Sequence, residues 1–348
     1  MVRMMHGKKA AWMRSVGAVV VSVCAAGGLA GPAETVVAAQ EEGVLHGSVT
    51  IALADGEREA VSLHSGVRDA SAEEPIENDG ETRYRIASLT KLVTQLAVLR
   101  LIDDGRVGLD EPIGTYRPGL RADWAGEVTV RDLLSMRSGL PRELHRTPER
   151  GVEFDGDGLV GAYLDRRLRR VDLESEPGER ERYSNVGYWL LGTMIESVTG
   201  QTYVDAVNDL VCAPMSVEPI GFSPEELAGT DSRGHMGEEG VDQFGIATRY
   251  SSGGLCATSG QFAAIASGML RGGFLEDETR DLLFSGFGTE RKKDDLIIAG
   301  MVPGFMNLLL VDREHGVVVV SLNNRVARDP NAFMGVVRDT LREACQAE

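Results

Sequence analysis

The chain has 348 residues, 43% of them hydrophobic and 26% charged, which is enough for one large enzyme fold or for two domains. This composition excludes a disordered or a collagen-like chain. Acidic residues outnumber basic ones 53 to 36, and the formal net charge is −17. A nucleic-acid partner is therefore excluded, because binding to phosphate needs a basic face.

The first 39 residues have the composition of an export signal. Their basic residues, which precede an uncharged run over 15–31, are Arg3, Lys8, Lys9 and Arg14. Val37-Ala38-Ala39 then offers the small residues that a signal peptidase reads. The apolar run is short for a membrane span. We expect a signal peptide over 1–39, a periplasmic or secreted protein, and no stable membrane insertion after cleavage. A lipid anchor on Cys24 and an uncleaved anchor are the alternatives.

Strand and helix patterns follow in order. Residues 44–54 and 59–65 predict two strands joined at Asp55-Gly56, a strong tight-turn signal. The run 88–104 has helical periodicity and ends before Gly105. Because apolar residues occur nearly all round this helix, we expect it to be central and buried.

The rest of the chain predicts helices in the middle and strands near the end. The expected helices are 129–136, 159–170, 186–198, 202–211 and 331–345, and the expected strands are 296–302, 305–311 and 317–322. Strands at both ends of the chain indicate an antiparallel sheet built from both termini, which is an α/β (α+β) fold with a mostly helical insertion. We expect one catalytic domain over 40–348, with an α/β lobe of about 44–112 plus 250–348 and a helical lobe of about 113–249.

The segment Ser88-Leu89-Thr90-Lys91 opens the predicted buried helix. The i, i+3 spacing places the Ser88 hydroxyl and the Lys91 amine on one face, about 5–6 Å apart at Cβ. The helix N-terminus adds backbone donors and positive dipole beside a developing oxyanion. Burial favours a neutral Lys91, which can take the Ser88 proton. The alternative is a chance Ser-x-x-Lys with a solvated lysine.

A second motif, Tyr183-Ser184-Asn185, follows Pro177-Gly178 and opens another predicted helix. A tyrosine can move protons to a leaving group, and an asparagine amide can hold a substrate carbonyl while it contacts Lys91. The alternative is a packing tyrosine followed by a serine or asparagine that caps the helix.

No metal or organic cofactor is expected. The cysteines after residue 39 are Cys212, Cys256 and Cys345, and three thiols with this spacing indicate neither a disulfide framework nor a metal site. The expected partner is a small-molecule or peptide acyl substrate.

Together the motifs resemble those of the serine β-lactamase-related hydrolases, which include class C β-lactamases, D-alanyl-D-alanine carboxypeptidases and related esterases. The segments that carry the resemblance are Tyr84–Lys91, Leu109–Pro112, Val128–Leu134, Ser138–Pro141, Pro177-Gly178, Tyr183–Asn185, Glu196–Gly200, Ser252–Leu255 and Pro303–Phe305. The resemblance implies a β-lactamase/transpeptidase-like fold. It also implies that Ser88 is the acylated nucleophile, Lys91 its base, Tyr183 the partner acid/base and Asn185 the substrate-amide clamp.

The third motif of that family is altered. Relatives carry Lys or His, then Thr, then Gly shortly before the Pro-Gly-Phe segment, whereas this chain reads Leu296-Ile297-Ile298-Ala299-Gly300. Ile297 and Ile298 replace the cation and the hydroxyl in this alignment. The Gly300 N–H needs no side chain and is expected to serve the oxyanion hole. A further departure is Met136, where relatives commonly have His.

Three hypotheses follow. The first is a serine esterase or amidase whose substrates lack the carboxylate of a penicillin or D-Ala terminus. The second is a β-lactamase or D,D-carboxypeptidase in which Arg249 or Arg325 replaces the missing cation. The third is an inactive binding protein of the same fold, against which the intact motifs argue.

Overall fold

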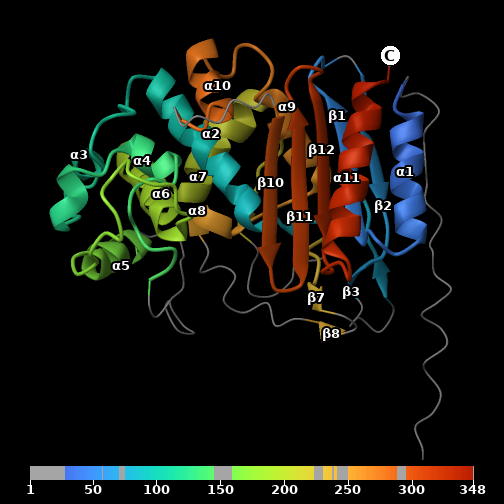
Figure 1. Ribbon diagram of the computed structural model, residues 1–348, viewed down its shortest axis with the longest axis horizontal. Coiled ribbons are helices and arrows are strands. Elements are labelled where there is room, and N and C mark those ends of the chain that lie inside the picture. Colours follow the sequence, from blue (N-terminus) through green and yellow to red (C-terminus); the bar gives the residue numbers. More distant parts are fainter. Residues whose placement is uncertain are drawn as a thin grey trace, which may run out of the picture.

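A five-stranded antiparallel sheet organises the computed structural model, which describes residues 28–56, 58–69, 75–144, 159–222, 230–236, 239–240, 250–287 and 295–347 (Figure 1). Its strand order is β10-β11-β12-β1-β2. The strands are β10 (Asp295–Val302), β11 (Phe305–Asp312), β12 (Val317–Asn323), β1 (Gly47–Leu53) and β2 (Val61–His64). The prediction of one antiparallel sheet made from both ends of the chain is confirmed.

Both faces of the sheet are covered, so its central strands are apolar without alternation. Every residue of β1 and β12 is buried. Val319 and Ile51 face one core, whereas Val318 and Val320 face the other. Burying both faces of a strand removes the polar positions that a half-exposed strand shows.

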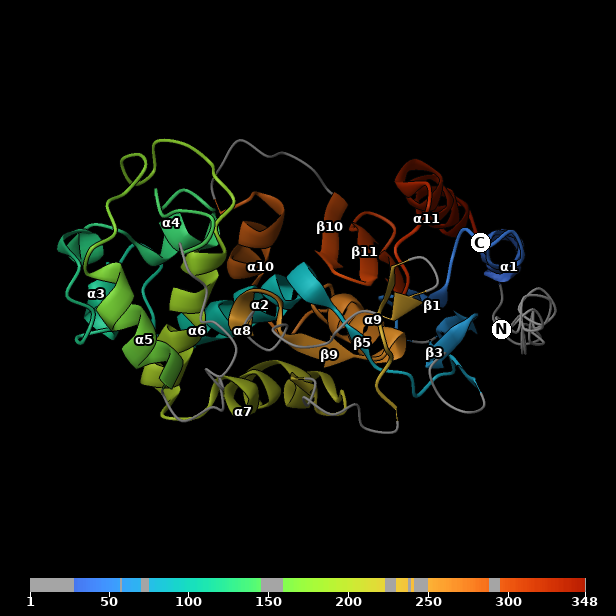
Figure 2. The same ribbon diagram turned by 90° about the horizontal axis from the view of Figure 1, so that it is seen from below.

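Two groups of helices cover these faces. On one side, α1 (Ala30–Glu41) packs beside α11 (Pro330–Cys345), and on the other α9 (Ser259–Gly268) contacts β1 and β12. Figure 2 shows α1 and α11 side by side at one end of the molecule and the helical lobe at the other. Helix α2 (Thr90–Asp103) lies between sheet and lobe, and ten of its residues are buried.

The helical lobe is built mainly from short helices. Its α-helices are α3 (Ile113–Tyr116), α4 (Val130–Leu134), α5 (Leu159–Leu168), α6 (Asn185–Thr199) and α7 (Tyr203–Val207), and α8 (Tyr250–Gly253) and α10 (Asp277–Phe284) follow later in the chain. Where sequence predicted one helix over 202–211, α7 gives way to a π-helical turn over Asn208–Cys212. The side chain of Asn208 bonds both backbone groups of Ile220, which ties this turn to the next segment.

A small sheet of order β5-β9-β6 positions the chain just before Ser88. Its strands are β5 (Tyr84–Arg85), β9 (Leu255–Ala257) and β6 (Gly221–Phe222), none of which had a clear sequence pattern. Further two-residue or three-residue strands are β3 (Val67–Asp69), β4 (Ile76–Glu77), β7 (His235–Met236) and β8 (Glu239–Gly240).

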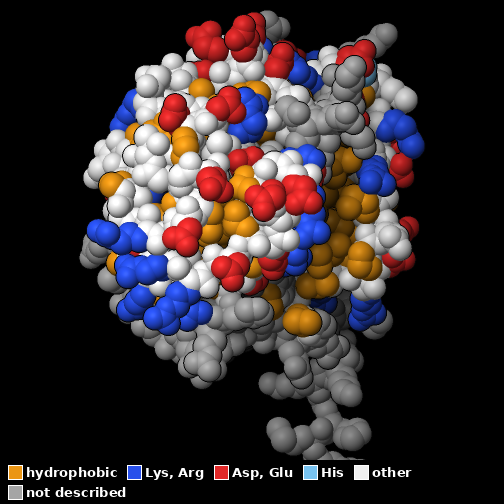
Figure 3. All heavy atoms as spheres, turned by 60° about the vertical axis from the view of Figure 1, so that its left-hand side comes forward, with side chains coloured by type: hydrophobic (Ala, Val, Ile, Leu, Met, Phe, Trp, Pro, Cys, Tyr) orange, Lys and Arg blue, Asp and Glu red, His pale blue; other side chains and the backbone are white. Residues whose placement is uncertain are grey.

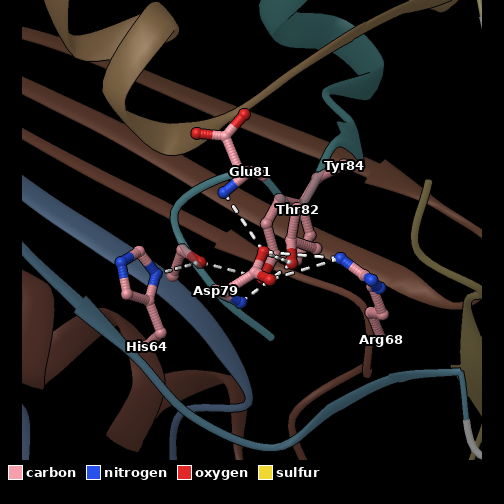
Figure 4. A network of polar contacts seen from close by, with 7 residues as sticks. His64, Arg68, Asp79, Glu81, Thr82 and Tyr84 are labelled. Atoms are coloured by element: carbon pink, nitrogen blue, oxygen red, sulfur yellow. Dashed lines mark hydrogen bonds and ion pairs between the residues drawn. The ribbon is translucent and has the colours of Figure 1, made fainter. Parts of the chain in front are cut away.

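Figure 4 shows the polar network that anchors β5 to the main sheet. The buried Ser48 hydroxyl lies 2.8 Å from His64 Nδ1 and 2.9 Å from Tyr84 Oη, so it joins β1, β2 and β5. Burial raises the pKa of the Tyr84 phenol, which keeps its hydroxyl neutral in this network. The network therefore fixes the strand from which the nucleophile segment departs.

Helix α1 bears on the expected start of the mature protein. The cleavage point predicted after Ala39 lies inside this helix, whose N-cap Leu29 and inward-facing Ala33 and Val36 are buried. Thr35 Oγ1 also donates to Glu343 of α11 over 2.7 Å. A domain that starts at residue 40 would lack this packed helix, and residues 1–27 lie outside the described part. No helix among the described residues is long and apolar enough to cross a membrane.

A truncation tests whether α1 belongs to the folded domain. We expect a chain that begins at Gln40 to have a lower thermal midpoint than one that begins at Gly28. The reason is that fully burying one Leu or Val side chain contributes about 1.5–3 kcal/mol. Circular dichroism on both chains measures the difference, and equal midpoints would contradict the structural role of α1.

Candidate active site

Ser88 sits at a sharp turn between β5 and α2. The turn is a 3₁₀ segment, Ala87–Leu89, that continues into α2. Ala87 has φ of +51°, a left-handed conformation that costs a non-glycine residue about 1–3 kcal/mol. The backbone N–H of Ile86 bonds Leu255 O, and Leu89 N–H bonds Ile86 O. These bonds hold the strained turn and place Ser88 at the N-terminal end of a long buried helix.

Lys91 is buried, with 5% of its surface exposed, and its ammonium joins three segments. Nζ donates to Asn185 Oδ1 over 2.7 Å and to Ser252 O over 2.6 Å, and it lies 3.5 Å from Ser88 Oγ. A buried ammonium needs such partners because it has lost its water. The predicted proximity of Ser88 and Lys91 is confirmed.

Two aromatic rings flank the same ammonium. Nζ lies 4.7 Å from the ring centroid of Tyr183 and 5.4 Å from that of Tyr188, within the range of a cation–π contact. Burial raises the pKa of the Tyr188 phenol, so this ring is a neutral wall. Tyr188 itself accepts from Gln95 and donates to the carbonyl of Leu134.

The second motif meets the first, and its three residues have separate tasks. Tyr183 Oη lies 2.6 Å from Ser88 Oγ, closer than Lys91 does. Ser184 caps α6, since its hydroxyl accepts from Gly187 N and donates to Pro141 O. The alternative interpretation, a helix cap, therefore applies to Ser184. The Tyr183 hydroxyl instead contacts Ser88, and the Asn185 amide contacts Lys91.

Two residues of the site, Glu143 and Arg142, were not predicted from the sequence. They lie next to each other on the loop after the Ser138–Pro141 landmark. Glu143 Oε1 accepts from Asn185 Nδ2 over 2.6 Å, so the Asn185 amide is held between Lys91 and a carboxylate. The Arg142 guanidinium lies 5.1 Å from the ring centroid of Tyr183, and the Arg142 carbonyl accepts from Asn185 N. No motif signals these residues; only their position beside a landmark singles them out.

Met136 supports the loop that carries Tyr183. It has φ of +61°, its Sδ accepts from Ser184 N over 3.3 Å, and its carbonyl accepts from Arg182 N. Met136, which stands where relatives commonly have His, therefore supports the loop through these hydrogen bonds and cannot transfer a proton.

Gly300 on β10 packs directly against the nucleophile turn. A Cβ at this position would lie 2.5 Å from Ile86 O and 2.6 Å from Leu89 Cδ1. Real Cβ atoms do not approach backbone oxygen this closely, so any side chain would push β10 away from Ser88. The structure therefore brings all five predicted residues to one place: Ser88, Lys91, Tyr183, Asn185 and Gly300.

The outer face of β10 is apolar. Burial alternates along the strand, so Ile298 packs inward while Ile297 and Met301 stand 49% and 56% exposed. Figure 3 shows hydrophobic side chains gathered in a hollow on one face of the molecule, with basic side chains beside it. The cross-strand neighbours of Ile297 and Met301 belong to the core beneath α1 and α11, so these two exposed side chains lie on the face of β10 opposite to the turn that carries Ser88. Ile298 and Gly300 lie on the face toward that turn.

Arg249 and Arg325 were the two residues expected to replace the cation of the third motif. Arg325 lies in a backbone bridge with His235 of β7, and Arg249 lies outside the described residues. Within the part of the chain that the structure describes, Arg142 is the arginine recorded beside the Tyr183 ring.

A family profile and several curated proteins match this chain. A family profile described as Beta-lactamase matches residues 34–335. A putative D-alanyl-D-alanine carboxypeptidase of Escherichia coli (strain K12) is 30% identical over 242 residues, which are 58% of this chain and 54% of that protein. Protein flp of Staphylococcus aureus (strain MW2) is 30% identical over 165 residues, 47% of this chain and 32% of the relative. The chain thus spans a third to a half of these relatives.

Solved structures agree on the fold. A penicillin binding protein from Bacillus halodurans has a TM-score of 0.72 and 19% identity, with 87% of this chain and 98% of the other covered. A D-amino acid amidase from Ochrobactrum anthropi SV3 has a TM-score of 0.72 and 22% identity, with 91% and 98% covered. These proteins share a mixed α/β fold in which an antiparallel sheet is flanked by helices. The chain belongs to the Beta-lactamase family.

Gly300→Ala tests the contact between β10 and the nucleophile turn. We expect a lower rate of Ser88 acylation, because the methyl group displaces β10 from Ile86 and Leu89. Gly335→Ala on α11 is the control, since a Cβ there meets nothing within 4 Å. The rate of labelling by a fluorophosphonate probe measures the effect, and unchanged labelling of Gly300→Ala would contradict it.

Proposed function

We propose that this protein is a serine acyl hydrolase that forms an acyl-enzyme on Ser88. The observation that carries the proposal is the 2.6 Å contact between Ser88 Oγ and Tyr183 Oη beside the buried Lys91. A nucleophile within hydrogen-bond reach of a proton acceptor, which is itself held by a third group, is the arrangement that covalent catalysis needs.

The first step is the transfer of the Ser88 proton. Tyr183 is the nearer acceptor, and the positive charge of Lys91 over its ring stabilises a phenolate. Lys91 therefore acts with Tyr183, and its contacts with Asn185 and Ser252 keep it in place during the transfer. Ser88 then attacks the substrate carbonyl, which the Asn185 amide orients.

Two backbone N–H groups stabilise the oxyanion, and Ser88 supplies the first at the positive end of α2. On β10, the two-residue turn Pro303-Gly304 makes Val302 and Phe305 a hydrogen-bonded pair. Alternation makes Gly300 and Asn307 the next such pair and leaves the Met301 N–H at the free edge of the sheet. We therefore assign the second donor to Met301 and a packing role to Gly300.

Breakdown of the tetrahedral intermediate needs an acid, and Tyr183 returns its proton to the leaving group. Water then attacks the acyl-enzyme while Tyr183 takes its proton. As the bond to Ser88 breaks, Tyr183 passes this proton to Ser88 Oγ, and the acid product leaves. The residues named here supply every proton transfer in this cycle.

The substrate class follows from the wall of the site. Ile298 is one of the two apolar residues that replace the cation and the hydroxyl of the third motif, and it lies on the face of β10 that packs toward the turn of Ser88. A carboxylate buried against this wall would lose its hydration without a partner, which costs several kcal/mol. Esters or amides with an uncharged apolar acyl group therefore fit the site best. The similarity to an amidase fold accords with this class.

Arg142 favours a second candidate function. Its exposed guanidinium lies on the side of Tyr183, the residue that protonates the leaving group. A leaving group that ends in a carboxylate, such as the D-Ala of a cell-wall peptide, has a cation there. This reading keeps a D,D-carboxypeptidase or β-lactamase activity as the alternative.

Covalent labelling tests the proposed chemistry. We expect intact-mass spectrometry to detect a fluorophosphonate adduct on the wild-type protein and no adduct on Ser88→Ala, because the probe needs an activated nucleophile. Tyr183→Phe keeps the ring and loses the acceptor, and we expect labelling to slow about 10²–10⁴-fold. A folded wild-type protein without any adduct would support the inactive binding protein instead, and an adduct on Ser88→Ala would remove Ser88 from its role.

Matched substrates test Arg142. We expect Arg142→Gln to reduce kcat/KM about 10–100-fold for an acyl-D-alanine with a free carboxylate, because a charge-assisted hydrogen bond is lost. The corresponding acyl-D-alanine amide should be unaffected, and Arg166→Gln on α5 is the control. Equal effects on both substrates, or turnover of p-nitrophenyl esters without turnover of either peptide, would exclude the carboxypeptidase reading.

A further inference from the structure

A cluster of three metal-ligating side chains lies outside the candidate active site. Asp312 ends β11, His315 lies in the turn to β12, and Cys345 is the last residue of α11. One ligand atom from each residue lies within 4.8 Å of the others. His315 Nδ1 and Asp312 Oδ1 are 2.9 Å apart, and the Cys345 thiol interacts with the same Asp312 carboxylate. The three groups thus already converge.

We propose that Asp312, His315 and Cys345 form a Zn²⁺ site that fastens the end of α11 to the β11–β12 hairpin. The proposal is independent of the acyl chemistry assigned to Ser88.

The spacing of the first two ligands suits a metal. Asp312 and His315 are separated by two residues across a tight turn, and paired ligands at this spacing recur in structural zinc sites. The Asp312 carboxylate also accepts from the His315 backbone N–H over 2.8 Å, which fixes the turn. Both side chains are thereby directed to the same side of the hairpin, where α11 passes.

The distances suit Zn²⁺. With bonds of about 2.0–2.3 Å to oxygen, nitrogen and sulfur, the ligand atoms of a tetrahedral Zn²⁺ lie roughly 3.3–3.7 Å apart. The cluster ranges from 2.9 Å between Asp312 and His315 to an upper bound of 4.8 Å. Coordination therefore requires the closest pair of ligand atoms to separate and the more distant pairs to approach one another.

The donor set selects the metal. A thiolate and an imidazole favour Zn²⁺ over Mg²⁺ or Ca²⁺, which prefer oxygen ligands. Asp295 pairs with Asp312 across β10 and β11, and its charge reaches both His315 and Cys345. Asp295 is therefore a candidate for a fourth ligand, and water is the alternative.

The local charge also favours a cation. The carboxylates of Asp295 and Asp312 lie opposite each other on β10 and β11. A divalent ion would offset the carboxylates of Asp295 and Asp312 and favour the thiolate, because a coordinated thiol loses its proton. The negative charge of these carboxylates thus favours the binding of a cation at the cluster.

Cobalt substitution tests the site on the full chain without a histidine tag. After treatment with a chelator and dialysis, Co²⁺ should bind once per chain and give a thiolate-to-cobalt charge-transfer band that Zn²⁺ abolishes. Cys345→Ser should lose this band. His315→Ala should weaken binding at least about 10–100-fold, the loss expected for even an outer-shell partner. Glu314→Gln, in the same turn, should bind as the wild type does.

Stability supplies a second measurement. Zn²⁺ should raise the thermal midpoint of the wild type and of Glu314→Gln and leave that of Cys345→Ser unchanged, because binding to the folded state alone stabilises it. Fluorophosphonate labelling of Ser88 should be the same in all of these variants. The absence of a charge-transfer band at stoichiometric Co²⁺ would overturn the proposal, as would Zn²⁺ stabilisation of Cys345→Ser equal to that of the wild type.

Discussion

The buried ammonium of Lys91 is the interaction on which the site depends. It has almost no contact with water, so its N–H groups need hydrogen-bond acceptors from the protein around it. Those groups come from the start of α2, from α6 and from α8, and Lys91 therefore holds the two motifs at one point. Glu143 extends the chain, because it fixes the other end of the Asn185 amide. Lys91 thus contacts Ser88 and also connects three helices.

The sheet supplies rigidity for this arrangement. Both faces of β1 and β12 are buried, and the strands next to the nucleophile are fixed by this core. The polar network around Ser48 then fixes Tyr84, four residues before Ser88. Ala87 keeps its strained backbone only because the surrounding bonds over-determine it. For the proposed role of Ser88 as nucleophile, a strained but well-anchored turn holds its hydroxyl in a fixed direction.

In the proposed mechanism, the altered third motif affects the choice of substrate more than the acyl transfer itself. The backbone of β10 keeps its register, and Gly300 keeps its close approach to Ile86. The donor that acyl transfer needs comes from the backbone, so it survives the loss of the charged side chain. What changes is the face of β10 toward the turn of Ser88, where Ile298 is apolar. Arg142 introduces charge again from a different loop.

The sequence by itself determined the elements with strong local signals: the strands of the main sheet, the long helices and the Ser-x-x-Lys and Tyr-Ser-Asn motifs. A continuous apolar run and an i, i+3 spacing involve residues that are close in the chain, so both patterns can be recognised in a short stretch of sequence. Only the tertiary structure decided which residues complete the site. Glu143 and Arg142 lie 40 or more positions from the motifs they contact, and no periodicity links them to Asn185 and Tyr183. For the same reason the sequence did not predict the contact of Cys345 with His315, which depends on where α11 crosses the sheet. Nor did it predict the position of α1, which depends on its packing against α11.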